Sequence, residues 1–174
     1  MARIESVIQV KKKVEDVFAF MNVAENHARF IPNMVEFKQT SAGAFGRVGA
    51  TANGLLRYLG IIKIPVSYEI IAHALNHALA MKGKMGPVFF KDGYVLSPSE
   101  NGARIKFWLE LSPTGWAKLF SPFAKLIGKI HAYETLRNLR KELEIWHSSS
   151  NEDASRLRRG AKGATPRNDM NHGN

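Results

Sequence analysis

The sequence contains no cysteine, no long hydrophobic run and comparatively few acidic residues. Without cysteine, the chain forms neither disulfide bonds nor thiolate metal sites. No stretch approaches the roughly 18 consecutive apolar residues that a membrane-spanning helix requires. The N-terminal segment MARIESVIQVKKK also lacks the apolar centre of a secretory signal. We therefore expect a cytoplasmic protein that needs neither a metal nor a cofactor.

The shortage of acidic side chains leaves the chain strongly basic. Lysine and arginine number 25 against 15 aspartates and glutamates, which gives a net charge of +10. From His147 onward, five basic and three acidic residues account for +2, so +8 belongs to the preceding part of the chain. This charge favours anionic partners such as nucleic acid or a phospholipid membrane, but it does not select between them.

The amino-acid composition changes at one point and divides the chain into two parts. Apolar residues make up 45% of the sequence, which is typical of a globular domain. After Trp146, the sequence HSSSNEDASRLRRGAKGATPRNDMNHGN has almost no large apolar side chains. Such a segment cannot offset the conformational entropy that ordering would cost. We expect one folded domain over residues 1–146 and a disordered basic tail over residues 147–174.

Two short amphipathic segments follow one another in VEDVFAFMNVAENHARFIP, residues 14–32. Helical spacing places four apolar side chains on one side of the first segment: Val14, Val17, Phe18 and Met21. A second segment runs from Ala24 to Phe30 and ends before Pro32, which disfavours a helical conformation in the preceding residue. Helices this short are marginal in water, so the pair must cover a larger apolar surface.

Alternating apolar and polar residues predict strands on either side of this helical pair. The clearest is ARIKFWLEL, in which Ile105, Phe107 and Leu109 alternate with polar or exposed positions. Short links between the later strands favour an antiparallel meander, because parallel neighbours need long crossover connections. Seven strands are expected, at residues 2–10 and at about 34–41, 47–59, 63–74, 77–84, 87–97 and 103–112.

A long helix is predicted in SPFAKLIGKIHAYETLRNLRKELEIW. Ser121 is suited to the N-cap and Pro122 to the first helical position. The preceding GWAKLF is expected to form a short turn that buries Trp116, Leu119 and Phe120. The helix carries a continuous apolar stripe: Phe123, Leu126, Ile127, Ile130, Tyr133, Leu136, Leu139, Leu143 and Trp146.

Element order and three stretches of sequence resemble the START-like (SRPBCC) superfamily, in particular its polyketide cyclase/dehydrase branch. The stretches are VEDVFAFMNVAENHARFIP, RVGATANGLLRYLGIIKIPVSYEIIAH and NGARIKFWLELSPTGWAKLFSPFAKLI. The resemblance covers residues 2 to about 146. It implies an α+β helix-grip fold, in which a curved seven-stranded antiparallel sheet wraps around the long C-terminal helix and two short helices close one end.

The resemblance also implies a hydrophobic ligand in a cavity between sheet and helix. Pockets of this kind typically measure roughly 300–1,000 Å³. Ordinary core packing is the alternative interpretation for each candidate, since half-buried strands need alternating apolar residues in any case. The candidate lining consists of Phe30, Met34, Tyr68, Met81, Phe90, Phe107, Phe123, Ile127 and Ile130.

Proton-transfer groups are candidates of a second kind, because a cyclase or dehydratase would need them inside the cavity. The candidates are His131, Glu134 and Tyr68, with a solvated or structural pair as the alternative for the first two. Asp92 could be an inward carboxylate with a raised pKa, although an edge or bulge position beside Gly93 is favoured.

Other polar residues are weaker candidates. An inward Arg57 could bind an anionic group if the strand register allows it. His73 and His77 flank a predicted turn, and without a third ligand they are interpreted as surface residues. His27 and Arg29 could lie at the mouth of the cavity, but exposed polar positions are the simpler interpretation.

Three classes of function remain open. The first is a carrier or sensor of a lipid, an isoprenoid quinone or a polyketide, which requires only the cavity. The second is an aromatase, cyclase or dehydratase that uses acid and base groups in the same cavity. The third is a basic module that binds RNA or an anionic membrane through its surface and tail. We favour the first, because no recognisable catalytic motif is present.

Overall fold

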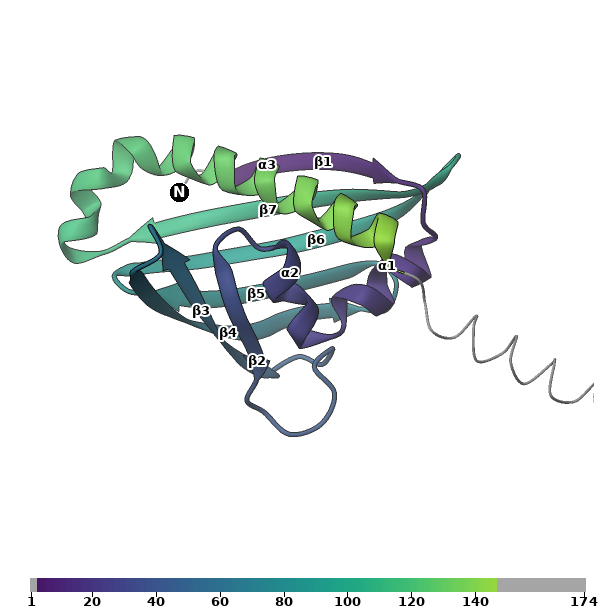
Figure 1. The fold of residues 1–174 in the computed structure, drawn as a ribbon, viewed down its shortest axis with the longest axis horizontal. Coiled ribbons are helices and arrows are strands. Elements are labelled where there is room, and N and C mark those ends of the chain that lie inside the picture. Colours follow the sequence, from purple (N-terminus) through teal and green to yellow (C-terminus); the bar gives the residue numbers. More distant parts are fainter. Residues whose placement is uncertain (1–2, 147–174) are drawn as a thin grey trace, which may run out of the picture.

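A seven-stranded sheet and one long helix form most of residues 3–146, the part of the chain that the computed structural model describes (Figure 1). The strands are β1 (Arg3–Val10), β2 (Met34–Gln39), β3 (Thr51–Tyr58), β4 (Ile62–Ala74), β5 (Ala78–Met85), β6 (Val88–Ser99) and β7 (Gly102–Pro113). The helices are α1 (Val14–Met21), α2 (His27–Phe30) and α3 (Ser121–Ile145), with 3₁₀ segments η1 (Ala24–Asn26) and η2 (Gly115–Phe120).

The sheet is an antiparallel meander in which the first strand lies beside the last. Its strand order is β1-β7-β6-β5-β4-β3-β2, so β1 and β2 are the two edges. The strands from β2 to β7 pair consecutively, and β1 pairs with β7 in a register that places Arg3 opposite Glu110. This arrangement confirms the expected helix-grip fold, with α3 lying across the sheet (Figure 1).

Alternation along the strands separates an inner from an outer face of the sheet. In β7, Ile105, Phe107 and Leu109 are buried against the interior. Asp92 also lies on the inner face, opposite Met81 of β5 and Leu109 of β7. The favoured edge or bulge position for Asp92 was therefore wrong, because β6 is an inner strand that pairs regularly on both sides.

The short helices cover one end of the inner face. The second segment, expected as a helix over Ala24–Phe30, is a 3₁₀ turn followed by a single α-helical turn. Asn26 Nδ2 donates a hydrogen bond of 2.8 Å to the carbonyl oxygen of Phe20 and fixes the bend between the segments. His27 was expected at an exposed position but is fully buried, with its ring stacked on Phe37 at 4.8 Å. The residues that α1 buries are Val14, Val17, Phe18, Phe20 and Met21.

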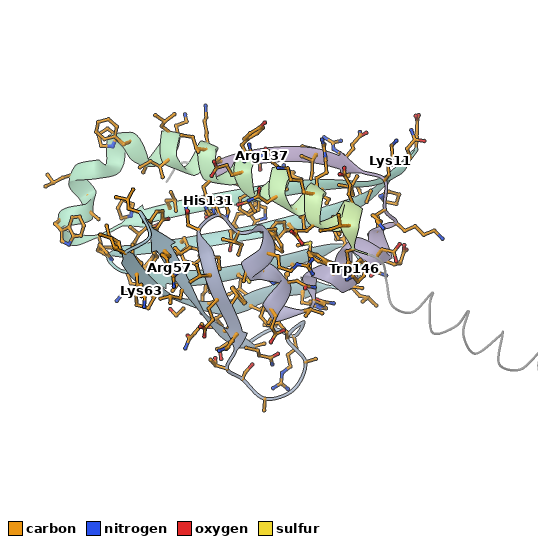
Figure 2. All side chains as sticks on the ribbon, in the orientation of Figure 1. Lys11, Arg57, Lys63, His131, Arg137 and Trp146 are labelled. Carbon is orange, nitrogen blue, oxygen red and sulfur yellow. The ribbon has the colours of Figure 1, made fainter. Side chains whose placement is uncertain are left out.

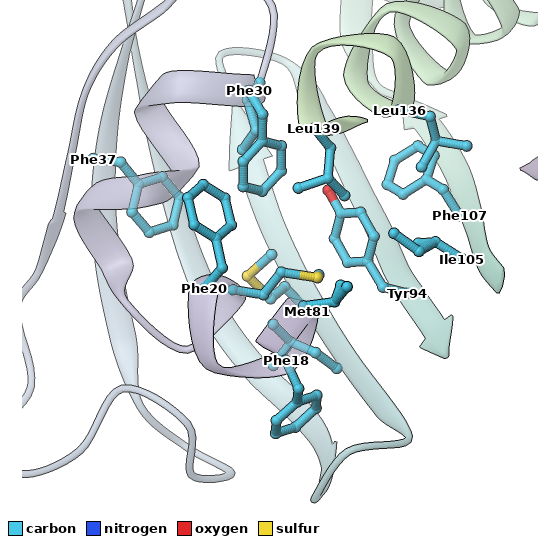
Figure 3. Close-up of a cluster of buried hydrophobic side chains, with 14 of the residues drawn as sticks. Phe18, Phe20, Phe30, Phe37, Met81, Tyr94, Ile105, Phe107, Leu136 and Leu139 are labelled. Atoms are coloured by element: carbon cyan, nitrogen blue, oxygen red, sulfur yellow. The ribbon is translucent and has the colours of Figure 1, made fainter. Parts of the chain in front are cut away.

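Beneath these helices, aromatic side chains from distant parts of the sequence form the core (Figure 3). The ring of Phe30 lies 6.1 Å from that of Phe20 and 6.2 Å from that of Tyr94, measured between centroids. Tyr94 in turn lies 4.9 Å from Phe107. Burial of each such side chain contributes on the order of 2 kcal/mol to stability. This cluster fills the end of the interior that the short helices cover.

The helix α3 buries its large apolar side chains in the C-terminal half and exposes them in the N-terminal half. Leu136, Leu139 and Leu143 are fully buried. Three polar contacts also hold this half: Arg29 to Glu142 at 2.6 Å, Asn138 Nδ2 to the Phe30 carbonyl at 3.3 Å and Lys12 Nζ to the Trp146 carbonyl at 2.9 Å. The first five residues of the predicted apolar stripe are exposed: Phe123, Leu126, Ile127, Ile130 and Tyr133. This part of α3 instead buries Gly128 and Ala132, and a Cβ atom at Gly128 would lie 2.3 Å from Ile4 Cδ1 of β1.

The segment η2 differs from expectation in the same way. Trp116 and Leu119 were expected to be buried but are 67% and 79% exposed. The side chain of Phe120 and the expected tail over residues 147–174 lie outside the described part of the structure. Within residues 3–146, no helix combines the length and apolar character needed to cross a membrane.

Candidate functional site

A cavity of about 100 Å³ lies between the inner face of the sheet and α3. Its volume is below the expected range, because the aromatic core fills the other end of the interior. Ile127 lines the cavity although its side chain is 59% exposed, so the cavity reaches the surface beside α3. The lining consists of Ile31, Leu56, Tyr58, Val66, Tyr68, Met85, Phe90, Asp92, Tyr94, Leu109, Leu111, Ile127, Gly128 and His131.

Five polar side chains interrupt the apolar lining. Asp92 and Tyr94 are successive inward positions of β6, Tyr58 comes from β3, Tyr68 from β4 and His131 from α3, where Figure 2 labels it. Among the described residues, neither Asp92 Oδ1 nor the Tyr94 hydroxyl has a hydrogen-bond partner, although both atoms are buried. Buried polar atoms normally have partners, so these two atoms mark a place where a bound molecule could supply them.

Burial shifts the protonation of these groups away from their charged forms. It raises the pKa of Asp92 from the usual 3.8 to about 7. It lowers the pKa of His131, although the negative charge of Glu134 partly opposes this shift. Burial, assisted by the charge of Asp92, also raises the pKa of Tyr68 and of Tyr94 well above the usual value. Near neutral pH the carboxyl group of Asp92 is therefore protonated in a large fraction of the molecules.

One wall of the cavity is aromatic. The rings of Tyr68 and Phe90 meet edge to face at 5.2 Å. Gly83 lies between these residues in the strand register, and a Cβ atom there would come within 2.3 Å of the Phe90 ring. The missing side chain at Gly83 thus creates the space that the Phe90 ring occupies.

Three of the nine predicted lining residues border this cavity: Tyr68, Phe90 and Ile127. Four others belong to the packed core: Phe30, Met34, Met81 and Phe107. Phe123 and Ile130 are exposed on α3. Ligand contact by any of the nine stays a prediction, but the structure brings only the first three together around one space.

The predicted proton-transfer residues divide similarly. His131 and Tyr68 line the cavity, whereas Glu134 lies one turn further along α3 and acts on it through the charge described above. Asp92 was expected at an edge or bulge, with an inward carboxylate as the alternative, and Tyr94 was not among the candidates. The alternation in VFFKDGYVL contains the necessary signal, because it places Asp92 and Tyr94 on the same face as the apolar residues of that strand.

The weaker polar candidates lie elsewhere. Arg57 is exposed on the outer face of β3, so it does not point into the cavity (Figure 2). Arg29 is paired with Glu142 on α3. His73 is partly buried and its Nε2 atom lies 3.2 Å from Asn22 Oδ1, while His77 is exposed. In residues 3–146 no group of three or more His, Asp or Glu residues has a geometry that could hold a metal ion.

A larger hollow of about 740 Å³ lies on the outer face of the sheet. Its rim is polar and charged, and Lys82 is already paired with Glu69 at 2.9 Å. The Lys84 ammonium lies over the exposed Phe89 ring at 5.4 Å. This hollow contains none of the buried, unpartnered polar atoms found among the described residues. The inner cavity is smaller but better suited to hold a ligand specifically.

Comparisons with known proteins agree with this architecture. A family model described as "Polyketide cyclase / dehydrase and lipid transport" matches residues 1–144. A crystal structure of a Chromobacterium violaceum protein is 13% identical with a TM-score of 0.66, covering 82% of this chain and 96% of that one. A Thermus thermophilus protein is 11% identical with a TM-score of 0.68, covering 82% and 97% respectively. A search of curated proteins found no match.

The two kinds of comparison support different statements. At such low identity, the solved structures establish the fold alone. The family match spans nearly the whole described domain and confirms the resemblance inferred from the sequence. Together with the helix-grip fold, its description indicates a hydrophobic ligand. The chain belongs to the family described as polyketide cyclase / dehydrase and lipid transport.

Proposed function

We propose that this protein binds and carries a hydrophobic small molecule whose polar group lies against Asp92 and Tyr94. The observation that supports this most directly is the pair of buried oxygen atoms without partners among residues 3–146, in a mostly apolar cavity. A buried polar group without a partner costs roughly 1–3 kcal/mol. A ligand that supplies the missing hydrogen bonds recovers this free energy, which favours bound over empty protein.

The chemistry of the two residues narrows the class of ligand. A protonated Asp92 donates a hydrogen bond to a carbonyl oxygen, and the Tyr94 hydroxyl can donate or accept. A carboxylate or phosphate beside Asp92 would instead raise the electrostatic cost of ionising that side chain. We therefore propose a lipid, isoprenoid quinone or polyketide that places a neutral carbonyl or hydroxyl group at this position.

Such a ligand is larger than the cavity. One water takes up about 30 Å³ in the liquid, so a space of about 100 Å³ accommodates only a fragment of a lipid or quinone. Additional room could come from α3, whose C-terminal half is held by the buried leucines and polar contacts described above. We propose that the N-terminal half, around Ile127 and Gly128, moves outward when the ligand enters.

Native mass spectrometry of the full chain purified from its host tests this proposal. We expect a stoichiometric apolar molecule, identified after extraction into organic solvent. Tyr94→Phe should lower its occupancy, because the hydroxyl that contacts the ligand is removed. Tyr133→Phe makes the same chemical change on the exposed side of α3 and should leave occupancy unchanged. A protein that is empty and binds no lipid, quinone or polyketide would contradict the carrier function.

An enzyme of the cyclase or dehydratase type is the second candidate. It is favoured by the presence of Asp92 and His131 in one cavity, where burial keeps the imidazole neutral and the carboxyl partly protonated. In a dehydration, His131 would accept the proton from carbon, and Asp92 would donate its proton to the departing hydroxyl, which leaves as water. Turnover of a β-hydroxy ketide by the parent protein, abolished in both Asp92→Asn and His131→Gln, would establish this activity.

The excess of basic over acidic residues supports a third proposal, in which the tail over residues 147–174 binds RNA or an anionic membrane. Deletion of residues 147–174 should then abolish salt-sensitive binding while ligand occupancy is retained. If salt-sensitive binding survives the deletion, the binding surface lies on the folded domain.

A further inference from the structure

Three segments with exposed apolar side chains meet at one end of the molecule. They are the β3–β4 turn, the β5–β6 turn, and η2 with the first half of α3 (Figure 1). Their proximity follows from the strand register, which places Val88 beside both Met85 and Pro113. Thr114 also donates two hydrogen bonds to the Pro87 carbonyl, at 2.8 Å from its backbone and 2.7 Å from its hydroxyl. We call this region the hairpin end.

The apolar side chains at the hairpin end are far more exposed than their size would favour. Leu59 and Ile61 at the tip of the β3–β4 turn are 88% and 81% exposed, and Leu119 of η2 is 79% exposed. Several exposed apolar side chains at one end of a domain mark a place where a partner or a membrane binds. The other large exposed apolar residues here are Ile62, Phe89, Trp116, Phe123, Leu126 and Ile127.

The conformation of Leu59 strengthens this argument. Its φ angle is 51°, in the left-handed region that favours glycine, asparagine and aspartate. Leucine is not favoured by this φ angle, and it does not contribute to the core, because its side chain is exposed to solvent. Strained positions that bring no benefit to the fold are associated with function. A leucine here is explained by contact with something outside the chain.

Charge identifies the chemistry of that contact. No acidic residue occurs in residues 55–68, 82–91 or 111–130, the segments that form the hairpin end. The same segments contain eight basic residues: Arg57, Lys63, Lys82, Lys84, Lys91, Lys118, Lys125 and Lys129. Lys82 pairs with Glu69 and Lys91 lies opposite Glu110 of β7, whereas the other six cations form no ion pair with any residue in the range 3–146. Apolar side chains surrounded by cations match a bilayer surface of anionic phospholipid.

We propose that the hairpin end docks onto an anionic phospholipid membrane, with Leu59, Ile61 and Leu119 entering the boundary between head groups and acyl chains. A second copy of this chain fits less well, because two such ends would bring cations together with no acidic residues to offset them. A single-stranded nucleic acid is also less suitable, because its bases stack on aromatic rings. Phe89, Trp116 and Phe123 offer such rings, but the most exposed side chains, Leu59, Ile61 and Leu119, are aliphatic.

The cavity opens at the same end. Ile127 belongs both to its lining and to the exposed apolar surface, and Tyr58 and Met85 line it from the two hairpins. Docking would therefore place the opening of the cavity against the bilayer, where an apolar ligand can pass without crossing water. The docking itself does not require the proposed carrier function, and each can be tested separately.

Flotation of the full-length protein with phospholipid vesicles tests the docking. We expect binding to phosphatidylcholine vesicles that contain phosphatidylglycerol, weaker binding without the anionic lipid, and weakening by salt. Leu59→Asn combined with Ile61→Ser should lower the partition coefficient roughly tenfold or more. The fold is preserved in this variant, because both side chains are exposed and asparagine suits the φ angle of residue 59. Lys118→Gln should lower the partition coefficient roughly fivefold.

Matched controls come from the opposite end of the molecule. Leu75 in the β4–β5 turn is 74% exposed, and Leu75→Ser should leave vesicle binding unchanged. Lys11→Gln removes an exposed cation at that end and should have a much smaller effect than Lys118→Gln (Figure 2). Equal vesicle binding by the parent and the Leu59→Asn/Ile61→Ser variant would overturn the proposal.

Two further outcomes would reassign the surface. In the first, sedimentation velocity detects concentration-dependent dimers of the parent but not of the Leu59→Asn/Ile61→Ser variant, and the variant still binds vesicles. This result would show that a second copy covers the hairpin end. RNA binding lost in this variant, without any vesicle binding by the parent, would make it a nucleic-acid surface. If the protein contains no ligand by native mass spectrometry but still floats with vesicles, the result contradicts the proposed carrier function and supports the proposed membrane docking.

Discussion

Two buried residues, Asp92 and His27, respond to pH in opposite directions. Burial raises the pKa of Asp92 to about 7 and lowers the pKa of His27 from 6.5 to about 4. Asp92 is therefore protonated in the folded state over a range where it is ionised in the unfolded state, so its contribution to stability falls as pH rises. His27 is neutral in the folded state where it would be charged in the unfolded state, so its contribution is lost as pH falls.

These contributions should nearly cancel between about pH 4 and pH 6.5, where each changes by roughly 1.4 kcal/mol per pH unit. Removing one residue should expose the slope of the other. Relative to the parent protein, Asp92→Asn should gain about 3 kcal/mol of unfolding free energy when the pH rises from about 4.5 to 6.5. His27→Leu should lose a similar amount over the same interval. Urea denaturation of the three proteins at both pH values measures these differences.

Other titrating groups are shared by all three proteins and cancel in the comparison. The double variant Asp92→Asn/His27→Leu is the control and should regain the shallow pH dependence of the parent. Variants that all follow the pH dependence of the parent would show that neither side chain is excluded from water in solution.

Tyr94→Phe should have opposite effects on stability and on binding. The hydroxyl is buried without a partner in residues 3–146, so its removal should leave the unfolding free energy unchanged or raise it by up to about 1 kcal/mol. Ligand affinity should fall roughly tenfold, because one hydrogen bond to the ligand is lost. Denaturation of the empty protein and titration with the extracted ligand measure the two quantities. If stability and affinity fall together, the hydroxyl contributes to the fold instead.

At the scale of elements, the position of α3 depends on Gly128. A Cβ atom there would lie 2.3 Å from Ile4 Cδ1 of β1 and 3.4 Å from Leu111 Cδ1 of β7. Gly128→Ala should improve helix propensity by about 1 kcal/mol. Overpacking against Ile4 should cost roughly 1–3 kcal/mol. We expect a net loss of stability, measured by chemical denaturation.

Ile4→Val provides the compensating change, because it removes the Cδ1 methyl group that the new side chain would meet. Alone it should cost about 1 kcal/mol. Combined with Gly128→Ala, it should cost less than the sum of the two single changes, since the two residues are in contact. Strict additivity would mean that α3 does not lie against β1 as described.

The sequence predicted elements better than it predicted the site, and α3 shows the reason. Periodicity identified the helix and its apolar residues, but it cannot indicate which of those residues the sheet covers. Phe123 and Leu136 therefore looked equivalent, although one is exposed and the other is fully buried. The inward orientation of Asp92 could have been recognised from alternation alone. Its lack of a hydrogen-bond partner could not have been predicted, because it depends on residues from other strands and from α3.

At the scale of the whole molecule, we expect residues 1–146 to fold without the remainder of the chain. The described core lies within this range, and Trp146 packs on Phe20 with ring centroids 5.5 Å apart. A chain that ends at residue 146 should keep its unfolding free energy to within about 0.5 kcal/mol and keep its ligand. A chain that ends at residue 138 loses Leu139 and Leu143, each worth roughly 2–5 kcal/mol, and should not fold. Chemical denaturation of both shortened chains measures their unfolding free energies and so locates the C-terminal boundary of the folded domain.

The pairing of β1 with β7 has a consequence for how the protein is made. β1 is translated before the other six strands of the described sheet, but its partner β7 emerges near the end of the domain, when Glu110 becomes available to pair with Arg3. The hairpins from β2 to β7 can form locally during this time, whereas β1 must wait for a contact between distant parts of the chain, which is intrinsically slow. On the ribosome, the first strand to be synthesised is thus among the last to join the sheet.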